Sequence, residues 1–306
     1  MNVRRVFQRV HGHLSICSTY SVSLINELEQ HKAKVMGRGL PERKALPGVK
    51  SIILVASGKG GVGKTTTAVN LACAMKVMEP DKDIGLLDAD VFGPSVPLMM
   101  NISGEPMLND ENLIEPLLNY GVKCMSMGLL VSGENAVVWR GLMVMQALER
   151  LTRHVAWAPL DILVVDTPPG TGDTHLSLAQ NLPVDGAIVV TTPQSAALQV
   201  TKRGVNMFEK LKVPLIGMVE NMSHAICSKC GERNYIFGNE TKRAAKDMGL
   251  EIIASFEVDQ NMSECINSGK PAIYALPDST HAEKYRQLAN KVFKYVSKKE
   301  KAKAEQ

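Results

Sequence analysis

"ASGKGGVGKTTT", residues 56–67, follows directly on the apolar run Ser51–Val55 and leads into a helix-like segment. Residues Gly58–Thr65 fit the pattern G-x-x-x-x-G-K-[ST], which forms a phosphate-binding loop when a strand precedes it and a helix follows it. Glycines let backbone N–H groups converge on phosphate oxygens without a clash from Cβ, and the helix N-terminus adds partial positive charge. Because both flanking elements are present, we prefer a nucleotide site to a chance glycine-rich turn.

The side chains of this loop are expected to differ in role. Lys64 should reach the β- and γ-phosphates, and the Thr65 hydroxyl should ligate Mg²⁺. The general pattern does not require Lys59, which is either a solvated charge or a group that reaches a phosphate on a facing subunit. The predicted nucleotide-binding set in the loop is Gly58, Lys59, Gly60, Gly61, Val62, Gly63, Lys64, Thr65 and Thr66.

Apolar strand-like runs alternate with helix-like segments along the rest of the chain. This alternation predicts an α/β protein with the three-layer P-loop NTPase fold, a mostly parallel sheet with helices on both faces. The pattern does not determine the strand order. The expected strands are Ser51–Ala56, Ile84–Leu87, Val122–Met127, Ile162–Val165, Ala187–Thr191, Leu215–Val219 and Ile252–Ser255. The expected helices are Lys64–Met78, Leu142–Arg153, Thr174–Gln180, Ala196–Leu211, Thr241–Met248 and Ala282–Val296.

Two acidic motifs follow expected strands, where open α/β sheets bind their ligands. In "LLDADVFGPS", Asp88 and Asp90 suit Mg²⁺ binding and the orientation of an attacking water, and solvated aspartates in a turn are the alternative. In "ILVVDTPPG", Asp166 has the position of a Walker B carboxylate that supports Mg²⁺. The following Thr167–Gly170 predicts a segment that senses the γ-phosphate.

Only two of the six cysteines, Cys227 and Cys230, are close enough in sequence to act as a unit. A C-x-x-C turn places two thiolates on one side, which suits Zn²⁺ or an iron–sulfur cluster. Two thiolates do not complete a four-coordinate site, and the chain has no second pair. The residues alone leave four alternatives: a [4Fe–4S] cluster shared by two subunits, a shared zinc, a redox pair and a structural pair.

The N-terminal segment has the composition of a mitochondrial presequence. Arg4, Arg5 and Arg9 lie among helically spaced apolar residues, and the first acidic residue is Glu27. A disordered N-terminus is the alternative. No secretory core is present, and no run approaches the ~20 apolar residues of a membrane span, so no stable membrane insertion is expected.

Beyond Glu27 the charge is close to neutral, which gives no support for a nucleic-acid partner. The predicted organisation is a presequence at 1–30, a connecting arm at 31–49, a P-loop ATPase domain with the cysteine segment at 50–297 and a charged tail at 298–306.

The loop "GKGGVGKTT" resembles the deviant Walker A motif of the MinD/Mrp/nitrogenase-iron-protein class of P-loop ATPases. Together with "LLDADVFGPSVP", "VVDTPPGTGD" and the C-x-x-C segment, it makes the chain similar to the Mrp/ApbC group of iron–sulfur carrier ATPases. The presequence makes it similar to mitochondrial members of that group. The resemblance covers about residues 36–275.

This resemblance implies a homodimer that holds two ATP molecules between its subunits. Lys59 would act across the dimer, Lys64 and Asp90 would take part in catalysis, and Asn221 would contact adenine. Hydrolysis would be slow and would serve cluster transfer. Cys227 of each subunit, with its Cys230, would hold a labile bridging [4Fe–4S] cluster. The recipients would be apo iron–sulfur proteins of the mitochondrial matrix, such as subunits of respiratory complex I.

The chain departs from the group's pattern in two places. Ser228 stands where the group usually has proline, which predicts a looser turn with both thiolates retained. The segment 256–275, "FEVDQNMSECINSGKPAIYA", lacks the group's Asp-Ile-Pro, Arg and Asp-x-Gly, which predicts a different nucleotide pocket on that side. A MinD/ParA-like positioning ATPase without a cluster is the alternative function. A nitrogenase-iron-protein-like electron donor ranks last, since its cluster cysteines lie apart in sequence.

Overall fold

The computed structural model describes residues 43–91, 93–130, 141–170 and 172–305. The predicted presequence and residues 31–42 of the predicted arm lie outside the described residues. The end of the arm is part of the folded domain, because Leu46 is buried and the backbone N–H of Lys44 donates to the carbonyl of Asn181. The first strand already begins at Val49, so the domain starts before the predicted boundary at residue 50.

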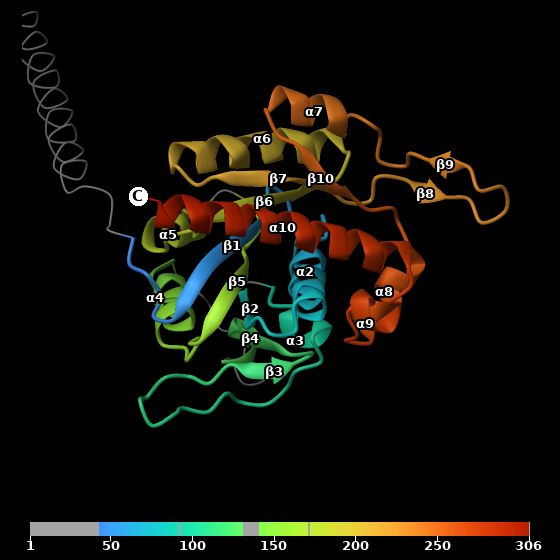
Figure 1. Cartoon of the computed structure of the whole chain (residues 1–306). Helices are drawn as coiled ribbons and strands as arrows, with labels where there is room; N and C mark the ends of the chain where they lie inside the picture. Colours follow the sequence, from blue (N-terminus) through green and yellow to red (C-terminus); the bar gives the residue numbers. More distant parts are fainter. Residues whose placement is uncertain (1–42, 92, 131–140, 171, 306) are drawn as a thin grey trace, which may run out of the picture. The chain divides into compact units, whose positions relative to one another are not determined.

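An eight-stranded sheet forms the centre of the domain, in the order β10-β7-β6-β1-β5-β2-β4-β3 (Figure 1). All neighbours pair in parallel except β3 and β4. The strands are β1 Val49–Ser57, β2 Ile84–Asp88, β3 Leu117–Asn119, β4 Val122–Ser126, β5 Leu160–Asp166, β6 Gly186–Thr191, β7 Leu215–Glu220 and β10 Ile252–Ser255. This confirms the mostly parallel α/β sheet that the sequence predicts.

The six predicted helices are present and, with one exception, begin and end close to the predicted positions, whereas the short helices α3, α8 and α9 were not predicted. The helices are α2 Lys64–Met78, α3 Val96–Met99, α4 Gly141–Arg153, α5 Asp173–Asn181, α6 Ser195–Lys210, α7 Thr241–Asp247, α8 Gln260–Asn267, α9 Ala272–Ala275 and α10 Thr280–Ala304, with a 3₁₀ turn at Met127–Leu129. The exception is α10, which continues past the predicted end at Val296 and includes most of the predicted tail.

Side chains of β1 alternate between two cores, as the period of a strand requires. Ile53 and Val55 pack with α2 and α10 on one face of the sheet. Ile52 and Leu54 pack with α4, α5 and α6 on the other face. The sheet is therefore buried on both sides, which explains why its inner strands are continuously apolar.

A two-stranded antiparallel hairpin, β8 (Ala225–Ile226) and β9 (Arg233–Asn234), stands out from the edge of the domain beyond β10 (Figure 1). It is inserted between β7 and α7, and we refer to residues 224–236 as the cysteine hairpin. None of the helices in the described ranges combines the length and apolar character needed to cross a bilayer.

Candidate nucleotide site and cysteine hairpin

The glycine loop turns between the end of β1 and the start of α2. Gly61 and Gly63 have φ angles of 76° and 87°, in the left-handed region that favours glycine. A Cβ on Gly63 would lie 2.1 Å from the side-chain nitrogen of Asn221. The loop therefore needs glycine at this position both for its backbone conformation and for the close approach of Asn221.

Two loop side chains converge on the predicted Walker B carboxylate at the end of β5. The Lys64 ammonium lies 2.8 Å from Oδ1 of Asp166, and the Thr65 hydroxyl donates to Oδ2 at 2.6 Å. Burial raises the pKa of Asp166, while the charge and hydrogen bond of Lys64 oppose that rise. A hydroxyl and a carboxylate in contact provide the oxygen donors that Mg²⁺ prefers, beside a cation suited to phosphate.

Asp90 belongs to this constellation. Its Oδ2 lies 3.8 Å from the Lys64 ammonium, and its side chain lines the pocket beside the loop. The pocket has a volume of about 370 Å³, towards the small end of the range of ligand pockets. Its lining includes Gly60, Gly61, Gly63, Lys64, Thr65, Thr66, Asp90 and Pro169.

Asp88 lies next to Asp166 in the sheet but does not line the pocket. Its carboxylate accepts backbone N–H groups from Ser95 and Val96 at 3.2 Å, and the hydroxyl of Ser126 at 3.0 Å. Burial and the neighbouring negative charge of Asp166 raise the pKa of Asp88 to about 7. In this conformation Asp88 holds the segment that follows β2, and Asp90 is the carboxylate presented to the pocket.

Lys59 and Asn221 lie at the edges of the loop. The Lys59 side chain is exposed, with its ammonium 3.4 Å from Oε1 of Gln194. The amide of Asn221 donates to the carbonyl of Val62 at 2.9 Å. Both positions are compatible with the predicted roles of Lys59 across a dimer and of Asn221 at adenine, which stay predictions.

A buried histidine supports the predicted γ-phosphate segment and was missed from the sequence. The hydroxyl of Thr167 donates its single proton to a carbonyl, that of Val55 (3.1 Å) or of Pro168 (3.3 Å). Its oxygen also lies 2.9 Å from Nε2 of His175, and the direction of this hydrogen bond depends on the histidine tautomer. Burial lowers the pKa of His175 to about 4, so its ring is neutral at physiological pH. The sequence feature that could have identified His175 is its position on the apolar face of α5, where a histidine must be buried.

Cys227 and Cys230 lie together in the turn of the cysteine hairpin, and both are exposed. The N–H of Gly231 donates to the carbonyl of Cys227 at 2.9 Å, and Gly231 has a φ of 74°, so glycine suits the turn. Hydrogen bonds from the backbone N–H groups of Cys230 and Lys229 lower the pKa of Cys227, which favours its thiolate.

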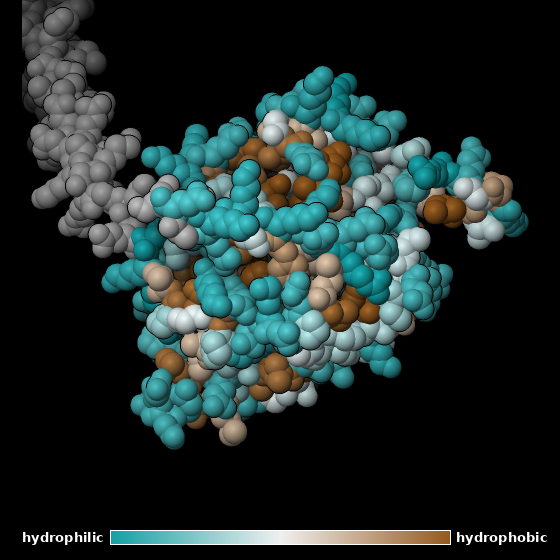
Figure 2. Space-filling view, in the orientation of Figure 1, coloured by the Kyte–Doolittle hydropathy of each residue, from teal (hydrophilic) through white to brown (hydrophobic). Residues whose placement is uncertain are grey.

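This pair has the donor chemistry of a zinc or iron–sulfur site but not the full ligand number. Within the described ranges, no group of three or more His, Cys, Asp or Glu side chains is arranged to hold a metal ion. The hairpin also exposes apolar surface where it leaves the domain (Figure 2). Two exposed cysteine side chains on a projecting hairpin are suited to a metal group that is completed by ligands from elsewhere.

A phosphate-binding loop after the central strand, a Walker B carboxylate beside it and a parallel sheet between helical layers define a P-loop NTPase. The fold is similar to that of a nucleotide-binding protein from Archaeoglobus fulgidus, solved in complex with ADP. The TM-score is 0.64 and the sequence identity 34%, over 73% of this chain and 88% of that one.

The family model described as "ParA: NUBPL iron-transfer P-loop NTPase" matches residues 48–293, and the chain belongs to this family. It is 48% identical to the iron–sulfur cluster transfer protein NUBPL of Mus musculus, over 87% of this chain and 83% of the relative. It is 51% identical to the iron–sulfur protein required for NADH dehydrogenase, mitochondrial, of Arabidopsis thaliana, over 81% of this chain and 80% of the relative. The predicted membership of the iron–sulfur carrier ATPases is confirmed.

Proposed function

We propose that this chain is an ATP-dependent iron–sulfur cluster carrier. The observation that carries the proposal is an exposed pair of thiols, Cys227 and Cys230, on a hairpin of a P-loop NTPase. Family membership supports it, since the family's description and the names of its relatives refer to iron or iron–sulfur transfer. The cargo is a labile [4Fe–4S] cluster.

ATP binds with its phosphates in the loop Gly58–Thr66. Lys64 neutralises the β- and γ-phosphates, and Thr65 and Asp166 hold Mg²⁺, which supplies charge neutralisation to the phosphate oxygens. Asp90 orients the water that attacks the γ-phosphate. Support comes from the contacts of Lys64 and Thr65 with the Asp166 carboxylate and from the place of Asp90 in the pocket lining. Hydrolysis is slow and serves cluster transfer.

The carrier works as a homodimer. One hairpin provides two thiolates, and a [4Fe–4S] cluster requires four ligands, so Cys227 and Cys230 of two subunits together complete the cage. Lys59 extends from the outer side of the loop to a phosphate bound by the facing subunit. Support comes from the exposure of both cysteines and of Lys59.

The cluster is delivered to apo iron–sulfur proteins in the mitochondrial matrix, including subunits of respiratory complex I. The Arabidopsis relative supports this destination, since its name connects it with the mitochondrion and with NADH dehydrogenase. The arginine-rich composition of residues 1–30 supports import.

Anaerobic reconstitution with iron and sulfide tests the proposal. Wild-type protein should bind iron and sulfide at about four atoms of each per dimer, with the absorbance and Mössbauer spectrum of a [4Fe–4S] cluster. The double variant Cys227→Ala/Cys230→Ala should bind almost none. Cys265→Ala, which removes a buried thiol of α8, should load as the wild type does. Equal loading of the double variant and the wild type would show that the ligands are wrongly assigned.

A further inference from the structure

A second pocket lies where the cysteine hairpin leaves the sheet, with a volume of about 320 Å³. Its floor is formed by Glu220 and Ser255, at the C-terminal ends of neighbouring strands β7 and β10. In the sequence, Glu220 precedes Asn221, whose side chain bonds to the phosphate-binding loop. The two pockets share no lining residue, so this pocket is separate from the one beside the phosphate-binding loop.

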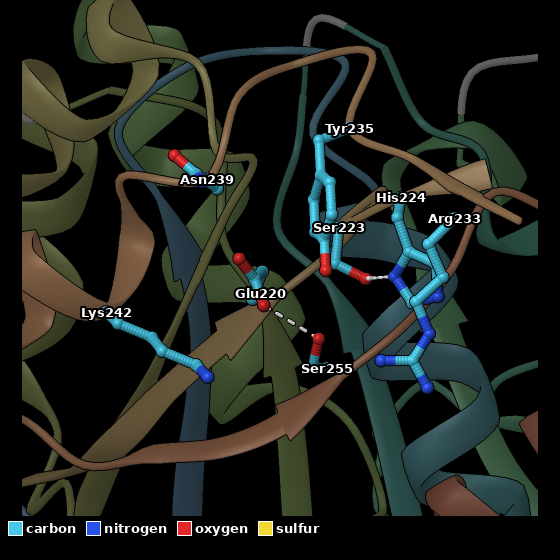
Figure 3. A pocket seen from close by; sticks show the side chains of 8 residues that line it. All are labelled: Glu220, Ser223, His224, Arg233, Tyr235, Asn239, Lys242 and Ser255. Atoms are coloured by element: carbon cyan, nitrogen blue, oxygen red, sulfur yellow. Dashed lines mark hydrogen bonds between the residues drawn. The ribbon is translucent and has the colours of Figure 1, made fainter.

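The pocket carries more positive than negative charge. Arg233 of β9 and Lys242 of α7 line it. Both are exposed, and the side chain of neither makes a hydrogen bond or an ion pair with any residue that the structure describes. Figure 3 shows Lys242 entering from one side and Arg233 from the other, with Glu220 and Ser255 between them. The Glu220 carboxylate accepts the Ser255 hydroxyl at 2.7 Å and keeps its negative charge, so one positive charge is in excess among these side chains. Two cationic side chains without an ion-pair partner among the described residues therefore face one pocket, and an acidic group could pair with both.

Aromatic and apolar side chains surround these cations. The rings of His224 and Tyr235 lie 5.8 Å apart between centroids on the Arg233 side of the pocket (Figure 3). Ile226 and Ile236, on the two arms of the hairpin, are 54% and 58% exposed. An occupant with an acidic side chain between apolar neighbours complements this surface in both charge and hydrophobicity.

The pocket is also close to the cysteines. Arg233 pairs with Ile226 across the hairpin, and Cys227 follows Ile226 directly. Paired strand residues lie about 5 Å apart and successive Cα atoms about 3.8 Å apart, so the backbone of Cys227 is within roughly 10 Å of that of Arg233. A peptide held at Arg233 brings its neighbouring residues to the cluster ligands.

We propose that this pocket is the docking site for the recipient protein, which inserts an acidic side chain between Arg233 and Lys242. The inference rests on the proposed carrier function, because it names the partner chemistry of the same hairpin. Handover is then a ligand exchange, in which bonds from iron to Cys227 and Cys230 are replaced by bonds to recipient thiolates. The protons of the recipient thiols pass to the carrier cysteines, and the cluster keeps its electrons.

Fluorescence anisotropy on the full chain without cluster tests docking alone. The probes are two labelled decapeptides with the same apolar flanks, one with a central Asp-Asp and the other with Lys-Lys. The wild type should bind the acidic peptide about tenfold more tightly or better, as charge-assisted hydrogen bonds predict. Arg233→Gln/Lys242→Gln should remove the preference, and Arg233→Glu/Lys242→Glu should reverse it.

The control is Arg243→Gln/Lys246→Gln, which removes the same charge from exposed positions of α7 outside the pocket lining. It should keep the wild-type preference. Equal binding of both peptides by the wild type, or a preference that survives in the pocket variant, would overturn the proposal. So would complete displacement of the peptide by millimolar inorganic phosphate, because the site would then recognise small anions.

Cluster loading, measured in parallel, separates this inference from the carrier function. Wild type and Arg233→Gln/Lys242→Gln should load equal iron and sulfide, but the variant should transfer cluster more slowly to a four-cysteine acceptor peptide with an Asp-Asp flank. If the loaded carrier transfers cluster equally fast to acceptor peptides with and without the Asp-Asp flank, the docking proposal is refuted while the carrier function stands. Peptide binding without any cluster loading refutes the carrier function and, with it, the recipient assignment.

Discussion

At Gly63 a single hydrogen atom in place of a side chain decides whether the phosphate-binding loop can close. Its φ of 87° disfavours any L-residue by about 1 kcal/mol, and a Cβ there would collide with the Asn221 amide. Gly63→Ala should therefore weaken ATP binding by about tenfold or more, measured by titration calorimetry. Gly93→Ala is the matched control, since Gly93 lines the same pocket and a Cβ there meets nothing within 4 Å. Equal affinities of the two variants would contradict the prediction.

His175 should make the stability of the domain sensitive to acid. Its pKa in the folded protein is about 4, against about 6.5 when unfolded, so the unfolded chain binds more protons between these values. The contribution is fully present above pH 6.5 and is lost as the pH falls towards 4. At pH 5 the loss relative to neutral pH should be about 2 kcal/mol.

Urea unfolding at pH 7.5 and at pH 5.0 measures this loss. His175→Gln retains a side-chain N–H that can donate to Thr167, so it should fold while losing this part of the pH dependence. If wild type and His175→Gln lose equal stability between the two pH values, other groups cause the acid sensitivity.

The residues that the motif assigns to phosphate and Mg²⁺ could be predicted by number, because a bound nucleotide would impose their type and spacing. Lys64, Thr65 and Asp166 converge as the motif requires. The different roles of Asp88 and Asp90 could not be predicted, since both follow the same strand and only the turn after it decides which carboxylate faces the pocket. His175 was missed because its partner is a single hydroxyl, which no spacing rule identifies.

At the scale of elements, the end of α10 is held by a buried carboxylate, Asp185, on the opposite end of the sheet from the phosphate-binding loop. Asp185 is 4% exposed and accepts the N–H of Ile52 at 3.0 Å. Lys303 donates to its Oδ1 at 2.8 Å, and Lys299 donates to its backbone carbonyl at 2.6 Å. The last turns of α10 therefore neutralise a charge that the sheet buries.

Truncation after Ser297 removes both lysines and leaves the Asp185 carboxylate without its cations. It should lower the free energy of unfolding by about 2 kcal/mol, less than for a fully buried pair because Lys303 is 59% exposed. Chemical denaturation measures the change. Truncation after Lys303 keeps both contacts and should leave stability unchanged, and an equal loss in the two truncations would exclude the Asp185 contacts as the cause.

The same contacts explain why the helix end was predicted too early. A run of charges has no apolar period, so the sequence of residues 298–306 indicates a solvated tail, and only the fold reveals that Asp185 lies within reach. The strand β3 and the hairpin strands β8 and β9 are two or three residues long. Such short elements carry no detectable alternation, and their pairing depends on the elements around them.

Across the whole molecule, two sites meet at the C-terminal end of β7. Asn221 bonds to the phosphate-binding loop through Val62, and the preceding Glu220 forms the floor of the pocket beneath the cysteine hairpin. Side chains of successive strand residues point to opposite faces, so one strand end contacts both sites.

A dimer that closes on ATP would complete both the cluster cage and the nucleotide site, which leads to a complementation test of Lys59. The Lys59→Ala variant keeps Lys64 and should still bind ATP in its own loop. The Lys64→Ala variant should lose ATP binding but keeps Lys59. Each alone should show little ATP hydrolysis. If Lys59 acts on the facing subunit's phosphate, mixing the two should restore part of the activity, because one site in each mixed dimer has both lysines.

Hydrolysis and sedimentation of the mixture, at rising total concentration, measure this recovery. Activity should increase with the amount of mixed dimer. Lys202→Ala, at an exposed position of α6, should hydrolyse ATP as the wild type does. Mixing it with Lys64→Ala should give no more activity than Lys202→Ala shows alone. If the mixture of the two lysine variants is no more active than its parts, Lys59 does not act in the catalytic site of the facing subunit. The phosphate-binding loop would then not be completed by a second copy of the chain.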